Sequence, residues 1–189
     1  MLYLASRSPR RRALLRSLGR PFRVVPSTYR EAIRRRESPS ANAMRNAIGK
    51  ARFARLPHAA RGIVIGADTF LYFRGRVIGK PCSLDHARAL LQALSGTSHW
   101  VYTGLCLPEA SRGRLRASYE KTRVTFKRLS PATQARVLAR TSPLDKAGGY
   151  AIQQDGRALI ARVEGSRSNI IGLPLELLRR ELRAMEHVR

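Results

Sequence analysis

The sequence predicts an α/β protein in which helices flank a mixed β-sheet. Short apolar runs of strand length alternate along the chain with amphipathic segments of helix length. Three of the helical segments open with Ser-Pro, at Ser8-Pro9, Ser38-Pro39 and Ser130-Pro131. A serine cap followed by proline is typical of a helix start. The length of 189 residues suits one domain or two small lobes.

Strands are expected where apolar residues form short runs. The run GIVIG, at 62–66, is typical of a central strand. The runs at 70–73 and 76–78 flank Arg74-Gly75, which favours a hairpin. The other expected strands are 2–4, 22–25, 100–107, 117–126 and 158–164.

Helices are expected after the capping serines. The first runs from Pro9 and stops at Gly19, the second reaches about residue 56, and Ser83 caps a third that runs to Leu94. Another begins at Pro131, and the last covers about 175–185. Residues 27–38 are polar and predict a loop.

Composition excludes a membrane protein, because no stretch approaches the roughly 20 apolar residues of a membrane span. The arginines near the N-terminus do not fit a signal peptide, so we expect a cytoplasmic protein. Cys82 and Cys106 lack metal-site spacing and are expected to be free thiols. A net charge of +25 would attract polyanions, nucleotides and nucleic acids among them, but it is spread along the chain.

Five segments are candidates for functional residues, and the last of them, residues 165–169, joins a loop to a helix start and is equally well explained as purely structural. The first, LASRSPRRRALL, joins a strand to a helix start, where free N–H groups, hydroxyls and arginines suit phosphate. The second is Gly66-Ala67-Asp68-Thr69, whose aspartate directly follows the GIVIG run. Asp68 would bind a divalent cation or act as a general base, or it would merely cap a turn.

The third segment is Gly79-Lys80-Pro81, where a lysine in a constrained turn either meets a phosphate or is simply exposed. Lys50 is notable because the chain has only five lysines. The fourth segment, DKAGGYAIQ at 145–153, allows close backbone approach to a ligand, and Gln153 suits a base edge. The alternative is a flexible loop that enters a strand.

Taken together, these motifs resemble the Maf family of nucleoside triphosphate pyrophosphatases. The matching segments are LASRSPRRRALL, AIGKA, GADT, GKP, LSG, TG, DKAGGYAIQ and GLP, which span residues 2–174. The resemblance implies a single domain over 1–189 with the Maf/ITPase-like fold, a mixed twisted sheet with two lobes around a nucleotide cleft. The GADT and DKAGGYAIQ forms are similar to the branch that acts on dTTP and UTP, rather than on 7-methyl-GTP.

The resemblance also implies an activity and a set of roles. The activity is hydrolysis of the α–β phosphate bond, giving a nucleoside monophosphate and pyrophosphate, with Mg²⁺ or Mn²⁺, in a cytoplasmic protein that is often a homodimer. Asp68 matches the proton acceptor. The positions matching substrate choice are Arg10, Thr69 and Gln153. The positions matching phosphate binding are Ser6, Arg11, Lys50 and Lys80. Glu31 and Asp68 match the metal-binding acids.

The chain departs from the family pattern at three positions. Arg30 stands where the family usually has Asp, and Gly49 stands where it usually has Glu. Gln154 replaces a glycine beside the predicted base pocket. Two acids are therefore missing near the expected metal and phosphate site. Two alternatives to the dTTP/UTP enzyme remain, a pyrophosphatase of other specificity and a basic nucleic-acid-binding protein on the same scaffold.

Overall fold

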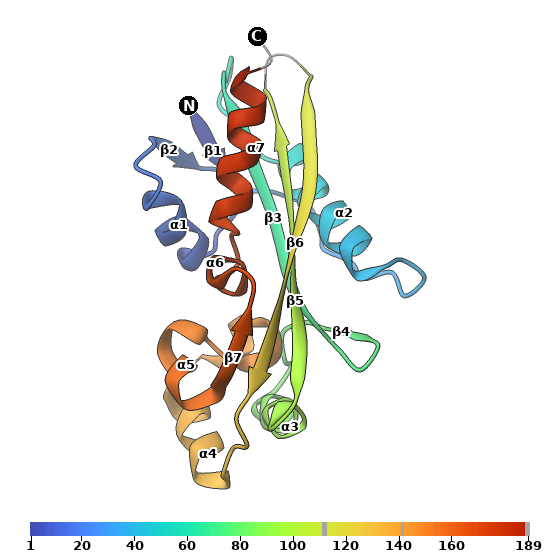
Figure 1. Cartoon of the computed structure of the whole chain (residues 1–189). Helices are drawn as coiled ribbons and strands as arrows, with labels where there is room; N and C mark the ends of the chain where they lie inside the picture. The colour runs from blue at the N-terminus through green and yellow to red at the C-terminus, as the bar shows by residue number, and fades with distance from the viewer. Residues whose placement is uncertain (111–112, 141, 188–189) are drawn as a thin grey trace. The chain divides into compact units, whose positions relative to one another are not determined.

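The computed structural model describes residues 1–110, 113–140 and 142–187 (Figure 1). The chain divides into two compact units. Unit 1 comprises Met1–Thr69, Thr103–Glu120 and Gly172–Arg189, and unit 2 comprises Phe70–Tyr102 and Lys121–Ile171. The prediction of a mixed sheet is confirmed. Its seven strands have the order β2-β1-β3-β5-β6-β7, and β4 pairs with β3.

In unit 1 the sheet is built on parallel pairs. Strand β1 (Leu2–Leu4) is fully buried and pairs in parallel with β2 (Phe22–Val24) and with the start of β3 (Ile63–Phe73). Helix α1 (Pro9–Arg16) follows β1, and helix α2 (Pro39–Arg52) follows β2. Ser8 and Ser38 accept hydrogen bonds from the backbone at the third residue beyond them, so both predicted caps are confirmed.

Two cores in unit 1 follow from the alternation of side chains along the strands. Leu4 of β1 and Ile65 of β3 belong to the core that includes leucines of helix α7 (Leu175–His187). Tyr3 and Val64, the neighbours of these residues, belong to a second core with Ala47 and Ala51 of α2. Consecutive residues of β3 therefore face different helices.

Helix α2 lies unusually close to strands β3 and β5 (Ser98–Pro108). A Cβ atom added at Gly66 of β3 would lie 2.2 Å from the carbonyl oxygen of Ala47, and one at Gly104 of β5 would lie 2.1 Å from that of Ala43. Any side chain at either glycine would push the helix away. The two glycines thus allow backbone contact between the helix and the sheet.

Unit 2 contains antiparallel pairs. Strand β4 (Arg76–Ile78) pairs with the end of β3, as the hairpin prediction requires, and β7 (Ile160–Glu164) pairs with the end of β6 (Leu115–Phe126). The helices of this unit are α3 (Leu84–Leu94), α4 (Pro131–Arg140), α5 (Ile152–Leu159) and α6 (Arg167–Ile171). Two short 3₁₀ turns, Pro143–Asp145 and Ala147–Gly149, precede α5.

Two expectations about local structure were wrong. Asp68 does not follow a strand that ends near Gly66, because β3 continues as one strand to Phe73. Residues 145–153 do not lead into a strand: two 3₁₀ turns are followed by α5, which includes Ala158 and Leu159 of the expected strand. In α5 the buried residues Ile152, Asp155 and Leu159 have helical spacing.

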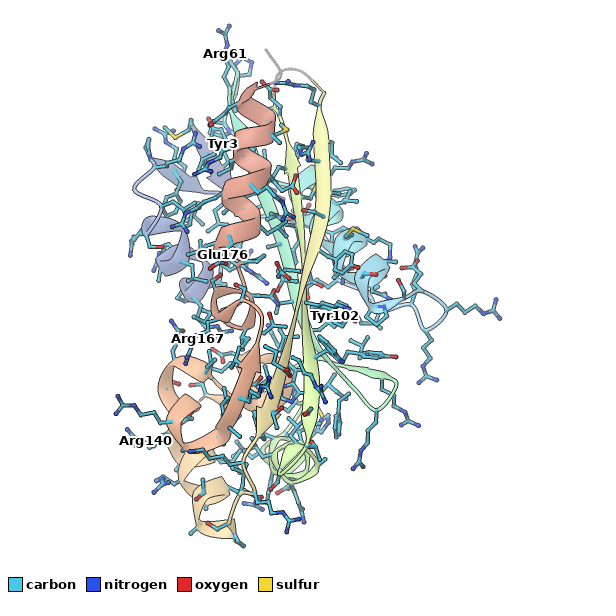
Figure 2. All side chains as sticks on the ribbon, in the orientation of Figure 1. Tyr3, Arg61, Tyr102, Arg140, Arg167 and Glu176 are labelled. Atoms are coloured by element: carbon cyan, nitrogen blue, oxygen red, sulfur yellow. The ribbon has the colours of Figure 1, made fainter. Side chains whose placement is uncertain are left out.

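The basic side chains and the cysteines are placed largely as expected. Among the labelled residues, Arg61 and Arg140 project outward from the ribbon (Figure 2), and both are exposed. Both cysteines are free: Cys82 is exposed, whereas Cys106 is buried and its burial raises the pKa of the thiol to about 12. Among the described residues, no helix is long and apolar enough to cross a membrane.

A buried histidine lies in the core of unit 2. His99 is 1% exposed, its Nε2 atom lies 2.8 Å from the Tyr150 hydroxyl, and its ring packs edge-on against Phe126. Burial lowers the pKa of His99 from 6.5 to about 4. The folded protein therefore keeps this ring neutral at pH values where an unfolded chain would protonate it.

We expect His99 to make folding stability depend on pH. As the pH falls from about 6.5 to about 4, the unfolded chain gains a proton at His99 that the folded chain does not, so stability decreases. The contribution of His99 to this loss of stability approaches about 1.4 kcal/mol per pH unit. The free energy of unfolding, measured with urea across this pH range, should fall less steeply with decreasing pH for His99→Gln than for the wild type. His58, which is exposed, offers the control, and an equal reduction of the pH dependence in His58→Gln would contradict the assignment.

Candidate active site

The candidate active site is built around Asp68, in the middle of β3. Its side chain is buried, with 4% of the residue exposed. By strand alternation it lies on the same side of β3 as Val64 and Gly66, the side that α2 covers. A carboxylate in this position needs partners, because burying an isolated charge is costly.

Helix α2 supplies these partners. The Nζ atom of Lys50 lies 2.7 Å from Asp68 Oδ1 and donates to the carbonyl oxygen of Ala67 at 3.2 Å. The side-chain amide of Asn46 donates from Nδ2 to Asp68 Oδ2 at 2.8 Å. Asn46 and Lys50 are four residues apart and so lie on one face of the helix. Each oxygen of the carboxylate therefore has its own donor.

Sequence reasoning missed Asn46. A signal was present, because a polar residue one helical turn before a candidate lysine lies on the same face as that lysine. Asn46 is 0% exposed. Its role depends on a tertiary contact with β3 that no local pattern of the sequence reveals.

Glu31 extends the cluster from the loop between β2 and α2. Its Oε1 atom lies 2.6 Å from Lys50 Nζ, and its side chain is 55% exposed. Lys50 thus bridges an accessible carboxylate and a buried one. The structure brings together Glu31, Lys50 and Asp68 as the family resemblance led us to expect, whereas Arg30 is exposed.

The electrostatics keep Asp68 ionised. Burial by itself raises the pKa of this carboxyl group, but the charges of Lys50 and Arg11 and the hydrogen bond from Asn46 outweigh burial. The pKa consequently lies below its ordinary value of 3.8. A carboxylate that stays ionised at neutral pH is available to accept a proton.

A second group of candidate residues gathers around Arg11 of α1. Its guanidinium donates to the Gly172 carbonyl oxygen at 2.7 Å, to Thr69 Oγ1 at 3.0 Å and to Ser6 Oγ at 3.3 Å. Thr69 follows Asp68 in β3 and therefore points to the opposite side of the strand. Ser6, Arg11 and Thr69 are brought together as one hydrogen-bonded group, and the partly buried Arg10 precedes Arg11 on the same helix.

The remaining predicted residues belong to unit 2. Lys80 is exposed beyond β4, and Gln153 is exposed in the first turn of α5. The segments that carry them are in contact, because the Gly148 amide donates to the Gly79 carbonyl oxygen at 3.0 Å. Gly148 has a φ of +71°, which favours glycine. Lys146 of the same segment is buried and pairs with Asp145 at 2.6 Å.

The structure gives a local account of two departures from the family pattern. A Cβ atom at Gly49 would lie 2.3 Å from the ring of Tyr29, so the tyrosine occupies the space that a side chain at this position would need. Gln154 is exposed and helical within α5. It requires no unusual backbone conformation.

The carboxylates of the cluster limit how a divalent metal would bind. Among the described residues, no group of three or more His, Cys, Asp or Glu side chains is arranged to hold a metal. Glu31 and Asp68 supply the carboxylate oxygens of the described cluster, and both lie against the ammonium group of Lys50. Two carboxylates suit Mg²⁺ when substrate phosphates supply further ligands.

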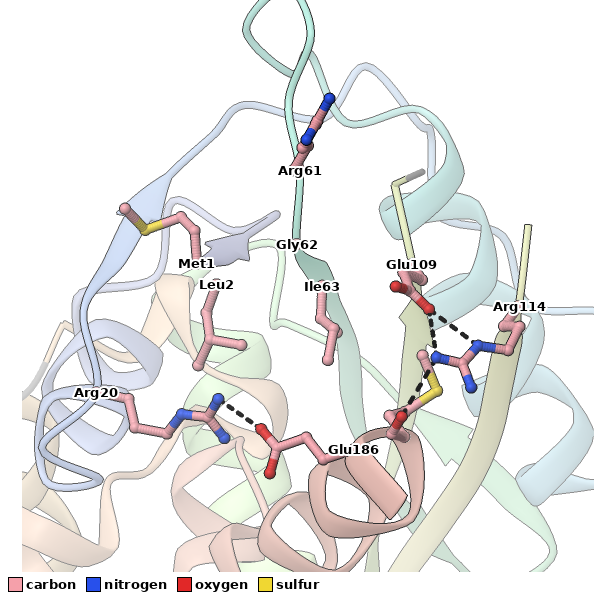
Figure 3. A pocket seen from close by; sticks show the side chains of 10 residues that line it. Met1, Leu2, Arg20, Arg61, Gly62, Ile63, Glu109, Arg114 and Glu186 are labelled. Atoms are coloured by element: carbon pink, nitrogen blue, oxygen red, sulfur yellow. Dashed lines mark hydrogen bonds and ion pairs between the residues drawn. The ribbon is translucent and has the colours of Figure 1, made fainter. Parts of the chain in front are cut away.

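A pocket elsewhere in unit 1 is separate from these groups. It has a volume of about 720 Å³ and is lined in part by Met1, Arg20, Arg61 and Glu109 (Figure 3). No candidate residue lines it. Arg20 pairs with Glu186 at 2.6 Å, and Glu109 pairs with Arg114 at 2.7 Å.

Comparison with known proteins gives concordant matches. A family model described as Maf-like protein matches residues 1–185. A dTTP/UTP pyrophosphatase of Moorella thermoacetica is 44% identical over 174 residues, which cover 92% of this chain and 89% of that protein. A dTTP/UTP pyrophosphatase of Gloeobacter violaceus is 42% identical over 177 residues, covering 94% and 92%. The solved Ham1 protein of Staphylococcus aureus, 15% identical, matches 97% of this chain and 98% of its own with a TM-score of 0.51, which shows a similar fold.

We expect Lys50 and Glu31 to contribute very differently to stability. Lys50→Met leaves the buried Asp68 carboxylate without its cation and should cost about 3–5 kcal/mol. Glu31→Gln removes a carboxylate whose side chain is 55% exposed and should cost about 0–1 kcal/mol. Urea denaturation measures both free energies of unfolding. Adding Asp68→Asn to Lys50→Met should restore part of the loss, and equal losses for the two single variants would contradict this description of the pair.

Proposed function

The chain belongs to the Maf family, and from this premise we propose that it is a nucleoside triphosphate pyrophosphatase that acts on dTTP and UTP. The products are the nucleoside monophosphate and pyrophosphate. The observation that carries the proposal is the buried Asp68 carboxylate, held ionised by Lys50 and Asn46 and linked through Lys50 to the exposed Glu31. The names of the two relatives support the choice of substrates.

In the proposed reaction Asp68 is the general base. A water molecule attacks the α-phosphorus and gives a proton to the Asp68 carboxylate, and the bond between the α-phosphorus and the bridging oxygen breaks. Pyrophosphate leaves with the electron pair of that bond. Lys50 and Asn46 each use one lone pair on an oxygen of Asp68, so each oxygen keeps another lone pair for the proton.

Positive charges and hydroxyl groups in the site suit the triphosphate. We assign phosphate binding to Ser6, Arg11, Lys50 and Lys80. Phosphate hydrolysis depends mainly on positioning and on stabilising the developing charge, which a guanidinium and ammonium groups provide. Arg11 is already oriented by its contacts with Gly172, Thr69 and Ser6, so little reorganisation is needed when phosphate binds.

We assign choice of the base to Arg10, Thr69 and Gln153. Gln153 has an amide that both donates and accepts, as a pyrimidine edge requires, and it is exposed. The contact between its segment and the Lys80 segment supports a shared role in binding one nucleotide. Thr69 bonds to Arg11, which connects base choice to phosphate binding.

A divalent metal, Mg²⁺ or Mn²⁺, belongs to the proposal. Glu31 and Asp68 would hold it together with phosphate oxygens, since two acids of the family pattern are replaced by Arg30 and Gly49. When bound, such an ion neutralises phosphate charge and acidifies water. A cytoplasmic location and a homodimeric assembly are proposed from the family resemblance alone.

We expect purified protein with Mg²⁺ or Mn²⁺ to release pyrophosphate from dTTP and UTP. Asp68→Asn should lower kcat about 10²- to 10⁴-fold, the usual contribution of a general base, while remaining folded by circular dichroism. The same assay on a panel of nucleoside triphosphates that includes 7-methyl-GTP distinguishes a dTTP/UTP enzyme from a pyrophosphatase of other specificity. Absence of pyrophosphate from every nucleotide, together with salt-sensitive binding of DNA or RNA, would favour the nucleic-acid-binding alternative that the +25 charge suggests.

We expect Gln153→Ala to weaken discrimination between bases. The ratio of kcat/KM for UTP to that for CTP should fall about 10-fold or more, since the two pyrimidines differ in the groups that an amide can pair with. The adjacent exposed residue provides a matched control, because Gln154→Ala removes the same group one position away. A ratio unchanged in Gln153→Ala would remove this residue from base selection.

A further inference from the structure

We propose that Asn46 is a positioning residue that fixes the orientation of the Asp68 carboxylate for catalysis. The inference rests on the proposed function, because it assigns Asn46 a role in the same site. The two side chains meet at 2.8 Å, from Asn46 Nδ2 to Asp68 Oδ2, and both are buried. Lys50 Nζ donates to the other carboxylate oxygen, Oδ1, at 2.7 Å, so both oxygens of Asp68 accept a hydrogen bond.

The orientation of the Asn46 amide is determined by the contacts of its oxygen, Oδ1. Asn46 Oδ1 accepts from the Ala32 backbone N–H at 3.3 Å and from Arg45 Nη1 at 3.1 Å. The Tyr29 hydroxyl lies 3.5 Å from the same oxygen. Donors surround Oδ1, so the oxygen must face them and the NH₂ group must face Asp68. A flipped amide would direct an oxygen towards a carboxylate and an NH₂ group towards three donors.

Gly49 makes room for one of these donors. The ring of Tyr29 fills the space where a Cβ atom at Gly49 would lie, 2.3 Å from the nearest ring carbon. A side chain at position 49 would displace the ring and withdraw its hydroxyl from Asn46. Tyr29 thus packs against Gly49 and contacts Asn46, which in turn donates to Asp68.

The competing interpretation is that Asn46 only anchors the loop at 29–32 to α2. A positioning role depends on the NH₂ group of the Asn46 amide, whereas a loop-anchoring role depends on its oxygen. Asn46→Asp separates them, because it keeps the shape and the oxygen that accepts from the loop but replaces the donor to Asp68 with a second carboxylate oxygen. Tyr29→Phe does the converse: it removes a loop donor and keeps the Asn46–Asp68 hydrogen bond.

The first experiment compares steady-state kinetics of these variants with the wild type. Asn46→Asp should lower kcat about 10- to 100-fold, because a misplaced catalytic group costs that much, with KM changed less than about 3-fold. Tyr29→Phe should lower kcat less than Asn46→Asp does. Retention of the wild-type kcat by Asn46→Asp would overturn the proposal.

Asn42 provides the matched control. It is 1% exposed, lies one turn earlier on α2 and donates to the carbonyl oxygens of Arg34, Glu37 and Ser38. Asn42→Asp should lower stability yet leave kcat per folded molecule unchanged. An equal fall in kcat for Asn42→Asp and Asn46→Asp would show a general effect of disturbing α2 and would overturn a positioning role.

A double-mutant cycle tests whether Asn46 acts through Asp68. In the Asp68→Asn background, Asn46→Asp should cause little further loss, because the group it positions is already absent. Losses that multiply would show that Asn46 acts elsewhere and would overturn the proposal.

A second measurement does not depend on activity. Hydrogen exchange of the Asn46 side-chain NH₂, followed by NMR, should accelerate in Asp68→Ala, while that of Asn42 should stay unchanged in the same sample. Unchanged protection of Asn46 would overturn the proposal even if the enzyme were inactive. Failure of the proposed function is recognised separately, because the wild type would then release no pyrophosphate from any triphosphate.

Discussion

The contact between the backbone of α2 and two strands is the constraint on which the site depends. Gly66 and Gly104 have no side chains, and the facing helix positions are Ala43 and Ala47. Without this close approach, the side chains of Asn46 and Lys50 would not reach Asp68 within hydrogen-bond distance. The geometry of the candidate site thus depends on two glycines, Gly66 and Gly104, whose lack of side chains lets the helix approach the strands.

Because side chains alternate along β3, the two groups of candidate residues contact opposite sides of this strand. Asp68 faces α2 and its lysine, whereas Thr69 bonds to Arg11 of α1. The proposed proton acceptor and a proposed specificity residue are therefore adjacent in sequence but have different hydrogen-bond partners. The charge of Arg11 nevertheless lowers the pKa of Asp68, so a mutation of Arg11 changes the surroundings of both residues.

Much of the fold could be predicted because it depends on local signals. Ser8, Ser38 and Ser83 were predicted as caps, and each accepts a backbone hydrogen bond in the structure. The hairpin around Arg74-Gly75 was predicted for the same reason. These features require only neighbouring residues.

The errors arose where tertiary contacts override local pattern. A buried Asp68 breaks the apolar run of β3, so the strand appeared to end early. Its charge is compensated by Lys50 of α2, which lies 18 residues earlier in the sequence. The family motifs led to Lys50 and Glu31, but they did not reveal Asn46. Helix α5 was missed because its two preceding glycines are typical of a loop.

The packing of Tyr29 against Gly49 has a consequence for how this site can change over time. Because the ring already fills the space at position 49, an acidic residue cannot be regained there by a single substitution without expelling the tyrosine. Displacement or loss of the tyrosine would have to accompany the change, and either would remove one of the donors around Asn46. The ring of Tyr29 therefore opposes a return to an acidic residue at position 49 on steric grounds.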